Sequence, residues 1–126
     1  IRRNFFGKYG IYTLNGSKNT GLDVLDFIKK VEQLGAGELL ITSIDKEGTW
    51  SGFDLELLKK ITSVVKIPVI AGGGCGSIQH IADAVNLGGV NAVAIGSMAV
   101  FQKKGMGVLI SFPKTQEIEN CLHKVG

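Results

Sequence analysis

Apolar residues recur at helical spacing in four stretches of the chain. The first places five of them on one helical face: Leu22, Leu25, Ile28, Val31 and Leu34. Gly35 follows where a helix C-terminal glycine belongs. The other three helices are expected over residues 54–65, 77–87 and 113–125. Asp54 and Ser77 are suited to N-capping, and Pro113 to the first helical position.

Short apolar runs separate these helices: "ELLITSID" (38–45), "PVIA" (68–71) and "NAVAIG" (91–96). They do not alternate between apolar and polar residues, which is typical of a parallel sheet with both faces covered by helices. Aromatic and β-branched residues over 5–16 predict a small hairpin-like extension before the first helix. The order of elements therefore predicts an α/β fold.

The chain is short for a closed barrel of this kind. "LGAGELLITS" from Leu34 resembles "LGGVNAVAIGS" from Leu87, as expected for repeating strand–helix units. A closed (β/α)8 barrel typically needs about 250 residues, and this chain has 126. Half of such a barrel would expose the unpaired edges of its sheet. We therefore expect either a piece of a longer protein, which the first residue Ile1 favours over a start at Met, or two paired copies.

Composition narrows the function classes. The chain is 44% hydrophobic with a net charge of +3, no apolar run reaches the ~20 residues of a membrane span, and no secretory signal is visible. We expect a cytoplasmic protein that binds neither membrane nor nucleic acid, since the lysines form no basic stripe. Cys75 and Cys121 match no metal or redox spacing, and no metal or cofactor is expected. His80 and His123 are assigned to the surface or to helix packing.

A run of glycines carries the main functional signal. "VIAGGGCGS", Val69 to Ser77, ends a strand in Gly72, Gly73 and Gly74. A phosphate oxygen needs several backbone N–H groups within reach, and glycines leave that approach open.

Gly96 and Ser97 follow the next strand and suit the second half of such a clamp. The alternative is that the glycines serve tight turn geometry alone. If the glycines serve phosphate binding and not turn geometry, Gly74→Val should abolish binding of phosphate esters and leave the fold intact.

Polar residues follow the remaining strand and the extension. Thr42, Ser43 and Asp45 lie where a strand becomes a loop, and Asn15 lies in the polar loop before the first helix. Asp45 suits a general acid or base, or a residue that orders its loop by bonding the backbone, and the second role is favoured.

Several of these motifs together resemble one family. "GAGELLITSIDKEGTWSGFDLELLKKI", "IPVIAGGGCGS", "AVAIGSM" and "NGSKNTG" are similar to the C-terminal half of the cyclase subunit of imidazole glycerol phosphate synthase. The resemblance implies that residues 1–126 are strands six to eight, with their helices, of a single (β/α)8 TIM barrel domain. It also implies a lyase of histidine biosynthesis. Such an enzyme uses ammonia from a partner glutaminase to convert an aminoimidazole-carboxamide ribonucleotide to imidazole glycerol phosphate and an aminoimidazole-carboxamide ribotide.

The resemblance also implies roles for single residues. Gly48, Gly74, Gly96 and Ser97 match the phosphate clamp, Thr42 and Asp45 match pocket positions, and Glu38 matches a charged position where ammonia enters. A solvated strand start is the alternative for Glu38. The family's two catalytic aspartates would precede Ile1, so this chain is expected to be inactive alone.

Two alternatives remain open. "AGGG" replaces the family's "ASGG", and residues 5–21 and the tail "VFQKKGMGVLISFPKTQEIE" look more like a sister branch. That branch is associated with surface-polysaccharide biosynthesis, in which ammonia is supplied to a sugar nucleotide. The second alternative is a non-catalytic phosphate-binding half-barrel that pairs with itself.

Overall fold

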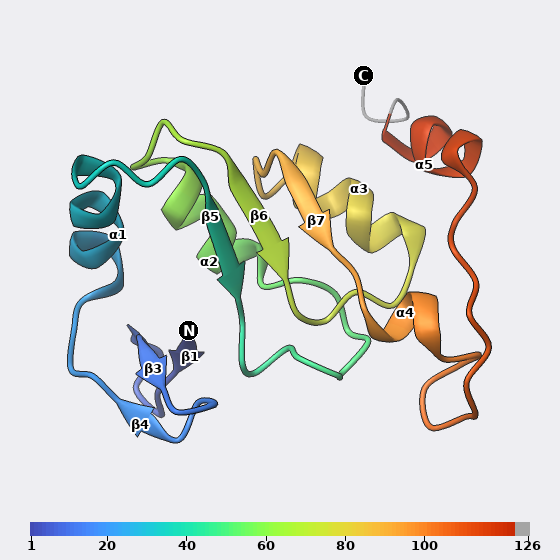
Figure 1. The fold of residues 1–126 in the computed structure, drawn as a ribbon, viewed down its shortest axis with the longest axis horizontal. Coiled ribbons are helices and arrows are strands. Elements are labelled where there is room, and N and C mark those ends of the chain that lie inside the picture. The colour runs from blue at the N-terminus through green and yellow to red at the C-terminus, as the bar shows by residue number, and fades with distance from the viewer. Residues whose placement is uncertain (123–126) are drawn as a thin grey trace.

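Three strand–helix units form the body of the molecule (Figure 1). The computed structural model describes residues 1–122. Helices α1 (Val24–Gln33), α2 (Leu55–Thr62) and α3 (Ile78–Asn86) alternate with strands β5 (Leu39–Thr42), β6 (Val69–Gly72) and β7 (Ala92–Ala94). The three helices and three strands expected from apolar spacing are therefore confirmed, although most are a few residues shorter.

The strands form one parallel sheet in the order β5-β6-β7. Leu39 pairs with Val69, and Ile41 pairs with Ala71, which in turn pairs with Val93. The carboxyl ends of all three strands therefore lie at the same edge of the sheet, which is where parallel α/β folds bind ligands.

One face of the sheet is buried beneath the helices. Leu39, Ile41, Val69 and Ala71 pack there with helical residues that include Ile28, Leu57, Ile61 and Ile81. Leu57, Ile61 and Val69 are the largest side chains that are fully buried. Each contributes about 1.5–3 kcal/mol by leaving water, so this layer holds the sheet and helices together.

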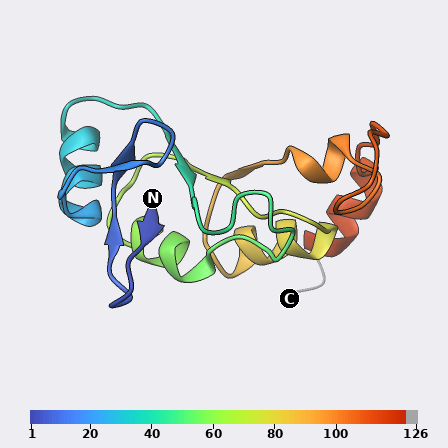
Figure 2. The ribbon, with the colours of Figure 1, turned by 90° about the horizontal axis from the view of Figure 1, so that it is seen from below.

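The opposite face is open, which corrects the expectation that helices cover both faces. Figure 2 shows α2 and α3 on one side of the strands and no described element over the other. Leu40 is 60% exposed, and Ala92 and Ala94 are exposed as well. The strand sequences are apolar on both faces because this second face also suits burial, but residues 1–122 do not supply the cover.

The predicted hairpin-like extension is two short hairpins. Strand β1 (Arg2–Arg3) pairs antiparallel with β2 (Tyr9–Gly10), and β3 (Tyr12–Thr13) pairs with β4 (Lys18–Asn19). Phe5 and Phe6 lie in the turn of the first hairpin and are almost fully exposed. The extension thus begins earlier and ends later than residues 5–16.

The first residue pairs with the free edge of β5. The Ile1 nitrogen donates to the Thr42 carbonyl oxygen at 2.8 Å, and the Ile44 N–H donates to the Ile1 carbonyl oxygen at 2.8 Å. This pairing brings the extension to the carboxyl end of the sheet.

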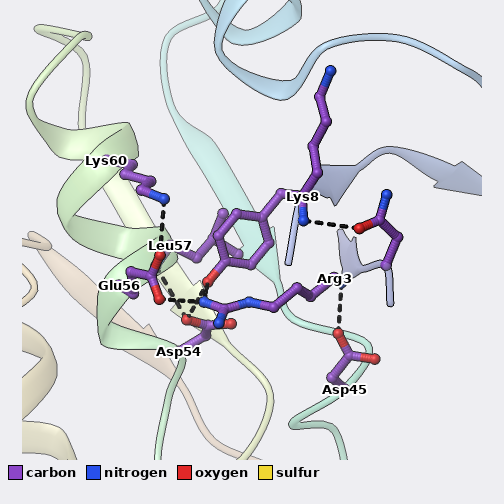
Figure 3. Close-up of polar contacts among 9 residues, drawn as sticks. Arg3, Lys8, Asp45, Asp54, Glu56, Leu57 and Lys60 are labelled. Atoms are coloured by element: carbon purple, nitrogen blue, oxygen red, sulfur yellow. Dashed lines mark hydrogen bonds and ion pairs between the residues drawn. The ribbon is translucent and has the colours of Figure 1, made fainter. Parts of the chain in front are cut away.

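A polar cluster holds the first hairpin against the start of α2 (Figure 3). The Arg3 guanidinium bonds to the Tyr9 hydroxyl and to the Glu56 carboxylate, and its carbon Cζ lies 4.6 Å from the centre of the Tyr9 ring. The Tyr9 hydroxyl donates to Asp54 Oδ1 at 2.9 Å. Burial raises the pKa of Tyr9 to about 12, and the bond to Asp54 acts in the same direction. Tyr9 is therefore a neutral donor across the physiological range.

The carboxyl-terminal part leaves the sheet. A short helix α4 (Ser97–Val100) follows β7, an exposed arm over 101–112 comes next, and α5 (Thr115–Leu122) packs against α3. The helix expected over 113–125 thus begins two residues later. Residues 123–125, with His123, lie outside the described part of the chain.

Candidate functional site

A cavity of about 260 Å³ lies at the carboxyl ends of the three strands. Its walls come from the ends of all three strands and the loops that follow them. Seven predicted site residues line it: Thr42, Gly48, Gly72, Gly73, Gly74, Gly96 and Ser97. The parallel sheet brings these residues together although they are spread over more than fifty positions of sequence.

Gly73 and Gly74 are packed tightly against the loop after β5, and Gly72 faces β5 itself. A Cβ on Gly73 would lie 2.8 Å from the Ser43 carbonyl oxygen, and a Cβ on Gly74 would lie 2.3 Å from the Gly52 carbonyl oxygen. The Gly52 N–H also donates to the Gly74 carbonyl oxygen at 2.9 Å. Close loop packing alone therefore requires glycine at positions 73 and 74.

This packing corrects the expected outcome of one substitution. Gly74 has a φ of +100°, a conformation that L side chains rarely adopt, and a valine Cβ there would collide with backbone atoms. Gly74→Val would disturb the fold itself, so it is no longer a clean test of ligand binding.

Gly96 is different. A Cβ built on it would meet no heavy atom within 4 Å. A Cβ on Gly48 would also point into open space, although the φ of +70° at Gly48 gives that position a conformational reason for glycine. Packing does not explain the glycine at position 96.

Unpaired backbone donors line the same cavity. Among the hydrogen bonds of residues 1–122, none has the N–H of Gly73, Gly74, Gly96 or Ser97 as its donor. Glu47 is the one lining residue with a carboxylate, and lysine and arginine are absent from the lining. Attraction for an anion therefore comes from uncharged donors: the backbone N–H groups and side-chain donors such as the Ser97 hydroxyl.

Four predicted residues lie elsewhere. The carboxylate of Asp45 accepts the Arg3 N–H at 2.7 Å and lies 3.7 Å from the Arg2 guanidinium, in a separate cavity beside the first hairpin. Asp45 thus holds the extension to the β5–α2 loop, whereas the sequence favoured a bond to the backbone of its own loop. Ser43 is buried, and its N–H donates to the Gly72 carbonyl oxygen at 3.3 Å. Asn15 lies in the β3–β4 turn, and Glu38 is exposed just before β5, at the opposite end of the sheet from the cavity.

His80 and Cys75 lie close to the glycines, and both make contacts within the fold. His80 Nδ1 accepts the Gly76 N–H at 3.1 Å, and a Cβ on Gly52 would touch the His80 ring. His80 is partly exposed and contacts the loops that contain Gly52 and Gly76. Cys75 lines the cavity but is buried, and burial raises the pKa of its thiol. The thiol stays protonated at neutral pH and is a poor nucleophile.

Trp50 and Glu47 were not predicted as cavity residues. Both belong to the loop between β5 and α2. The signal was present in the sequence, because "DKEGTWSG" places a large aromatic residue between two glycines directly after a strand.

Within residues 1–122, no group of three or more His, Cys, Asp or Glu side chains is placed to hold a metal ion. No helix in that part of the chain has the length and apolar character that crossing a membrane requires.

Comparison with solved structures agrees on the fold. A chain in the crystal structure of the Amycolatopsis orientalis BexX/CysO complex superimposes with a TM-score of 0.53 at 23% sequence identity. The match covers 60% of this chain and 30% of the other. At this identity the likeness concerns the fold alone.

Comparison with known sequences is more specific. Imidazole glycerol phosphate synthase subunit HisF of Alkaliphilus metalliredigens (strain QYMF) is 47% identical over 125 residues, which are 99% of this chain and 46% of the relative. The subunit of the same name from Prochlorococcus marinus (strain AS9601) is 47% identical over 95 residues, or 75% of this chain and 37% of the relative. The chain thus spans less than half the length of these relatives.

A family model places the chain directly. The model described as "Histidine biosynthesis protein" matches residues 2–105, which include the whole cavity and the sheet. Members of this family have the TIM-barrel fold. The chain therefore belongs to the histidine biosynthesis protein family, as do the imidazole glycerol phosphate synthase subunits that it resembles.

Proposed function

We propose that the cavity binds a phosphate group of a phosphorylated substrate. Gly96 carries this proposal, because it lines the cavity and packing gives this bare position no reason to be glycine. Four unpaired N–H groups border the same space. Several unpaired backbone donors on neighbouring residues form anion sites in many proteins. Gly48, Gly72, Gly73, Gly74, Gly96 and Ser97 are the proposed phosphate-binding residues, and Thr42 is a further pocket residue.

The chain acts, in this proposal, as the carboxyl-terminal half of a (β/α)8 barrel. The open sheet face and the relatives of more than twice the length support that arrangement. Ile1 already pairs with β5, so residues preceding it in a longer chain would continue alongside the sheet. Both catalytic aspartates implied by the family resemblance would come from that preceding half.

The proposed reaction is the cyclase step of histidine biosynthesis. Ammonia from a partner glutaminase attacks the aminoimidazole-carboxamide ribonucleotide, and the products are imidazole glycerol phosphate and an aminoimidazole-carboxamide ribotide. Glu38 lies at the end of the sheet opposite the cavity, which suits the proposed side for ammonia entry. Asp45 is engaged by Arg2 and Arg3 and supports the extension rather than the chemistry.

A second candidate is an ammonia-using subunit of an amidotransferase that acts on a sugar nucleotide. Both segments that resemble the sister branch carry exposed apolar side chains: Phe5 and Phe6 on the first hairpin, and Val108, Ile110 and Phe112 on the arm. A subunit that receives ammonia from a partner enzyme needs a docking surface of this kind.

A cyclase assay with ammonium as the nitrogen source tests the proposal. The 126-residue chain alone should show no turnover. A positioned acid or base contributes about 10²–10⁴-fold, the cavity has the single carboxylate of Glu47, and both catalytic aspartates implied by the resemblance would precede Ile1. Adding the amino-terminal half of a relative should restore cyclisation. Turnover by the chain alone would show that the chemistry is assigned to the wrong half. A restored barrel that binds the substrate without cyclising it would favour the second candidate.

A further inference from the structure

Trp50 is the one aromatic residue that lines the phosphate cavity, and it is the chain's only tryptophan. It lies on the β5–α2 loop, two residues after Gly48. Gly76, in the loop after β6, fits directly beneath it, since a Cβ on Gly76 would lie 2.6 Å from the Trp50 carbonyl oxygen. The tryptophan backbone is therefore fixed between two of the loops that form the cavity.

The backbone of Trp50 is strained. Its φ of +63° lies in the left-handed region, where glycine is the residue without steric cost. Bulky residues remain in this conformation when the surrounding structure imposes it, and such positions concentrate at ligand sites. Trp50 thus combines a backbone conformation that favours glycine with a large side chain.

Packing does not account for the indole. Trp50 is only half-buried, and it belongs neither to the hydrophobic core nor to the partly buried residues packed against that core. Within residues 1–122, no hydrogen bond has the indole N–H as its donor. The side chain therefore contributes little to the folded state that a smaller residue would not.

We propose that the indole of Trp50 contacts the carbon skeleton next to the bound phosphate and selects esters of a sugar ring over esters of an acyclic skeleton. This inference rests on the phosphate site of the proposed function. Backbone N–H groups recognise the phosphate but cannot distinguish one ester from another. An aromatic face beside them adds contact with the apolar C–H face of a sugar, a common division of labour in ligand pockets.

Isothermal titration of the full-length protein with three probes tests the inference. The probes are inorganic phosphate, glycerol 3-phosphate and ribose 5-phosphate, and the variants are Trp50→Gly and Trp50→Phe. Trp50→Gly should bind ribose 5-phosphate about tenfold more weakly and inorganic phosphate with unchanged affinity. Trp50→Phe should keep most of the preference for the ring over the acyclic ester, because an aromatic face remains.

Thermal unfolding of the same variants separates ligand contact from packing. Trp50→Gly should be at least as stable as the wild type, because glycine adopts a positive φ without strain. A clear loss of stability would show that the indole is structural and would overturn the inference. So would unchanged affinity of Trp50→Gly for ribose 5-phosphate.

Failure of the phosphate site would look different. A wild-type protein that binds none of the three probes would overturn the phosphate site, and this inference with it. Suppose instead that the wild type binds inorganic phosphate, and that the wild type and Trp50→Gly bind ribose 5-phosphate with equal affinity. This result would overturn the inference about Trp50 and leave the phosphate site standing. Tryptophan fluorescence of the wild type comes from Trp50 alone. Its emission should shift when ribose 5-phosphate is added, which reports the contact directly. Trp50→Phe lacks this emission and is the blank.

Discussion

A Cβ on Gly74 would lie 2.3 Å from the Gly52 carbonyl oxygen, whereas a Cβ on Gly96 would enter empty space. Both are glycines after neighbouring strands, and from the sequence they look equivalent. Their difference depends on how the loop over 43–52 folds against the end of β6. At the scale of single residues, the two positions give a matched pair for separating stability from binding.

Gly96→Ala should therefore weaken binding of phosphate esters by tenfold or more, because its methyl group would occupy the proposed phosphate approach. The variant should stay folded, since a Cβ at position 96 would meet no heavy atom within 4 Å. Urea unfolding and calorimetric titration measure the two effects. Unchanged affinity in folded Gly96→Ala would remove the main support for the phosphate site.

Gly74→Ala is the control. It should lose about 2–4 kcal/mol of stability through a strained φ and overpacking against Gly52. A Gly74→Ala protein as stable as the wild type would contradict the packing described here.

At the scale of elements, the helices and strands were predictable because their signals are local. The spacing of Leu25, Ile28 and Val31 marks a helical face within ten residues, and capping residues such as Asp54 and Ser77 act within one turn. The glycine packing between residues 43–52 and 72–76 was not predictable, because it joins loops that are distant in sequence. Anchoring of the first hairpin was missed for the same reason, since Arg3 and Glu56 are 53 positions apart.

The hairpin anchor predicts a specific dependence on alkaline pH. The pKa of Tyr9 is raised to about 12 in the folded state from about 10 in an unfolded chain. Its stabilising contribution is complete below pH 10 and is lost as the pH rises from about 10 to about 12. Tyr9→Phe should be less stable than the wild type by about 1 kcal/mol at pH 8 because it lacks the bond to Asp54.

Urea unfolding at pH 8, 10 and 11 measures this dependence. The difference between wild type and Tyr9→Phe should shrink as the pH rises above 10. A difference that stays constant would show that the Tyr9 hydroxyl is not held by Asp54 in solution.

At the scale of the whole molecule, the open sheet face dominates. Leu40, Ala92 and Ala94 are exposed on a sheet whose outer strands, β5 and β7, both have free edges over most of their length. Exposed apolar faces and unpaired strand edges promote association. The chain by itself is therefore expected to self-associate.

Analytical ultracentrifugation of the purified chain at micromolar concentration should show dimers or larger species. Leu40→Glu, which places a charge on the open face, should shift the distribution towards monomer. Leu34→Glu is the matched control, since Leu34 is exposed at the end of α1 and away from that face. A soluble wild-type monomer would count against the half-barrel proposal.

The close packing of Gly74 against Gly52 also bears on how sequence changes in relatives are interpreted. Gly74 and Gly52 meet backbone to backbone, so selection for a foldable protein preserves Gly74 even after activity is lost. Gly96 has no such protection and is free to drift once a ligand is no longer bound. In a descendant of this lineage, retention of the triple glycine would record inheritance of the fold. Replacement of Gly96 would mark the loss of its ligand.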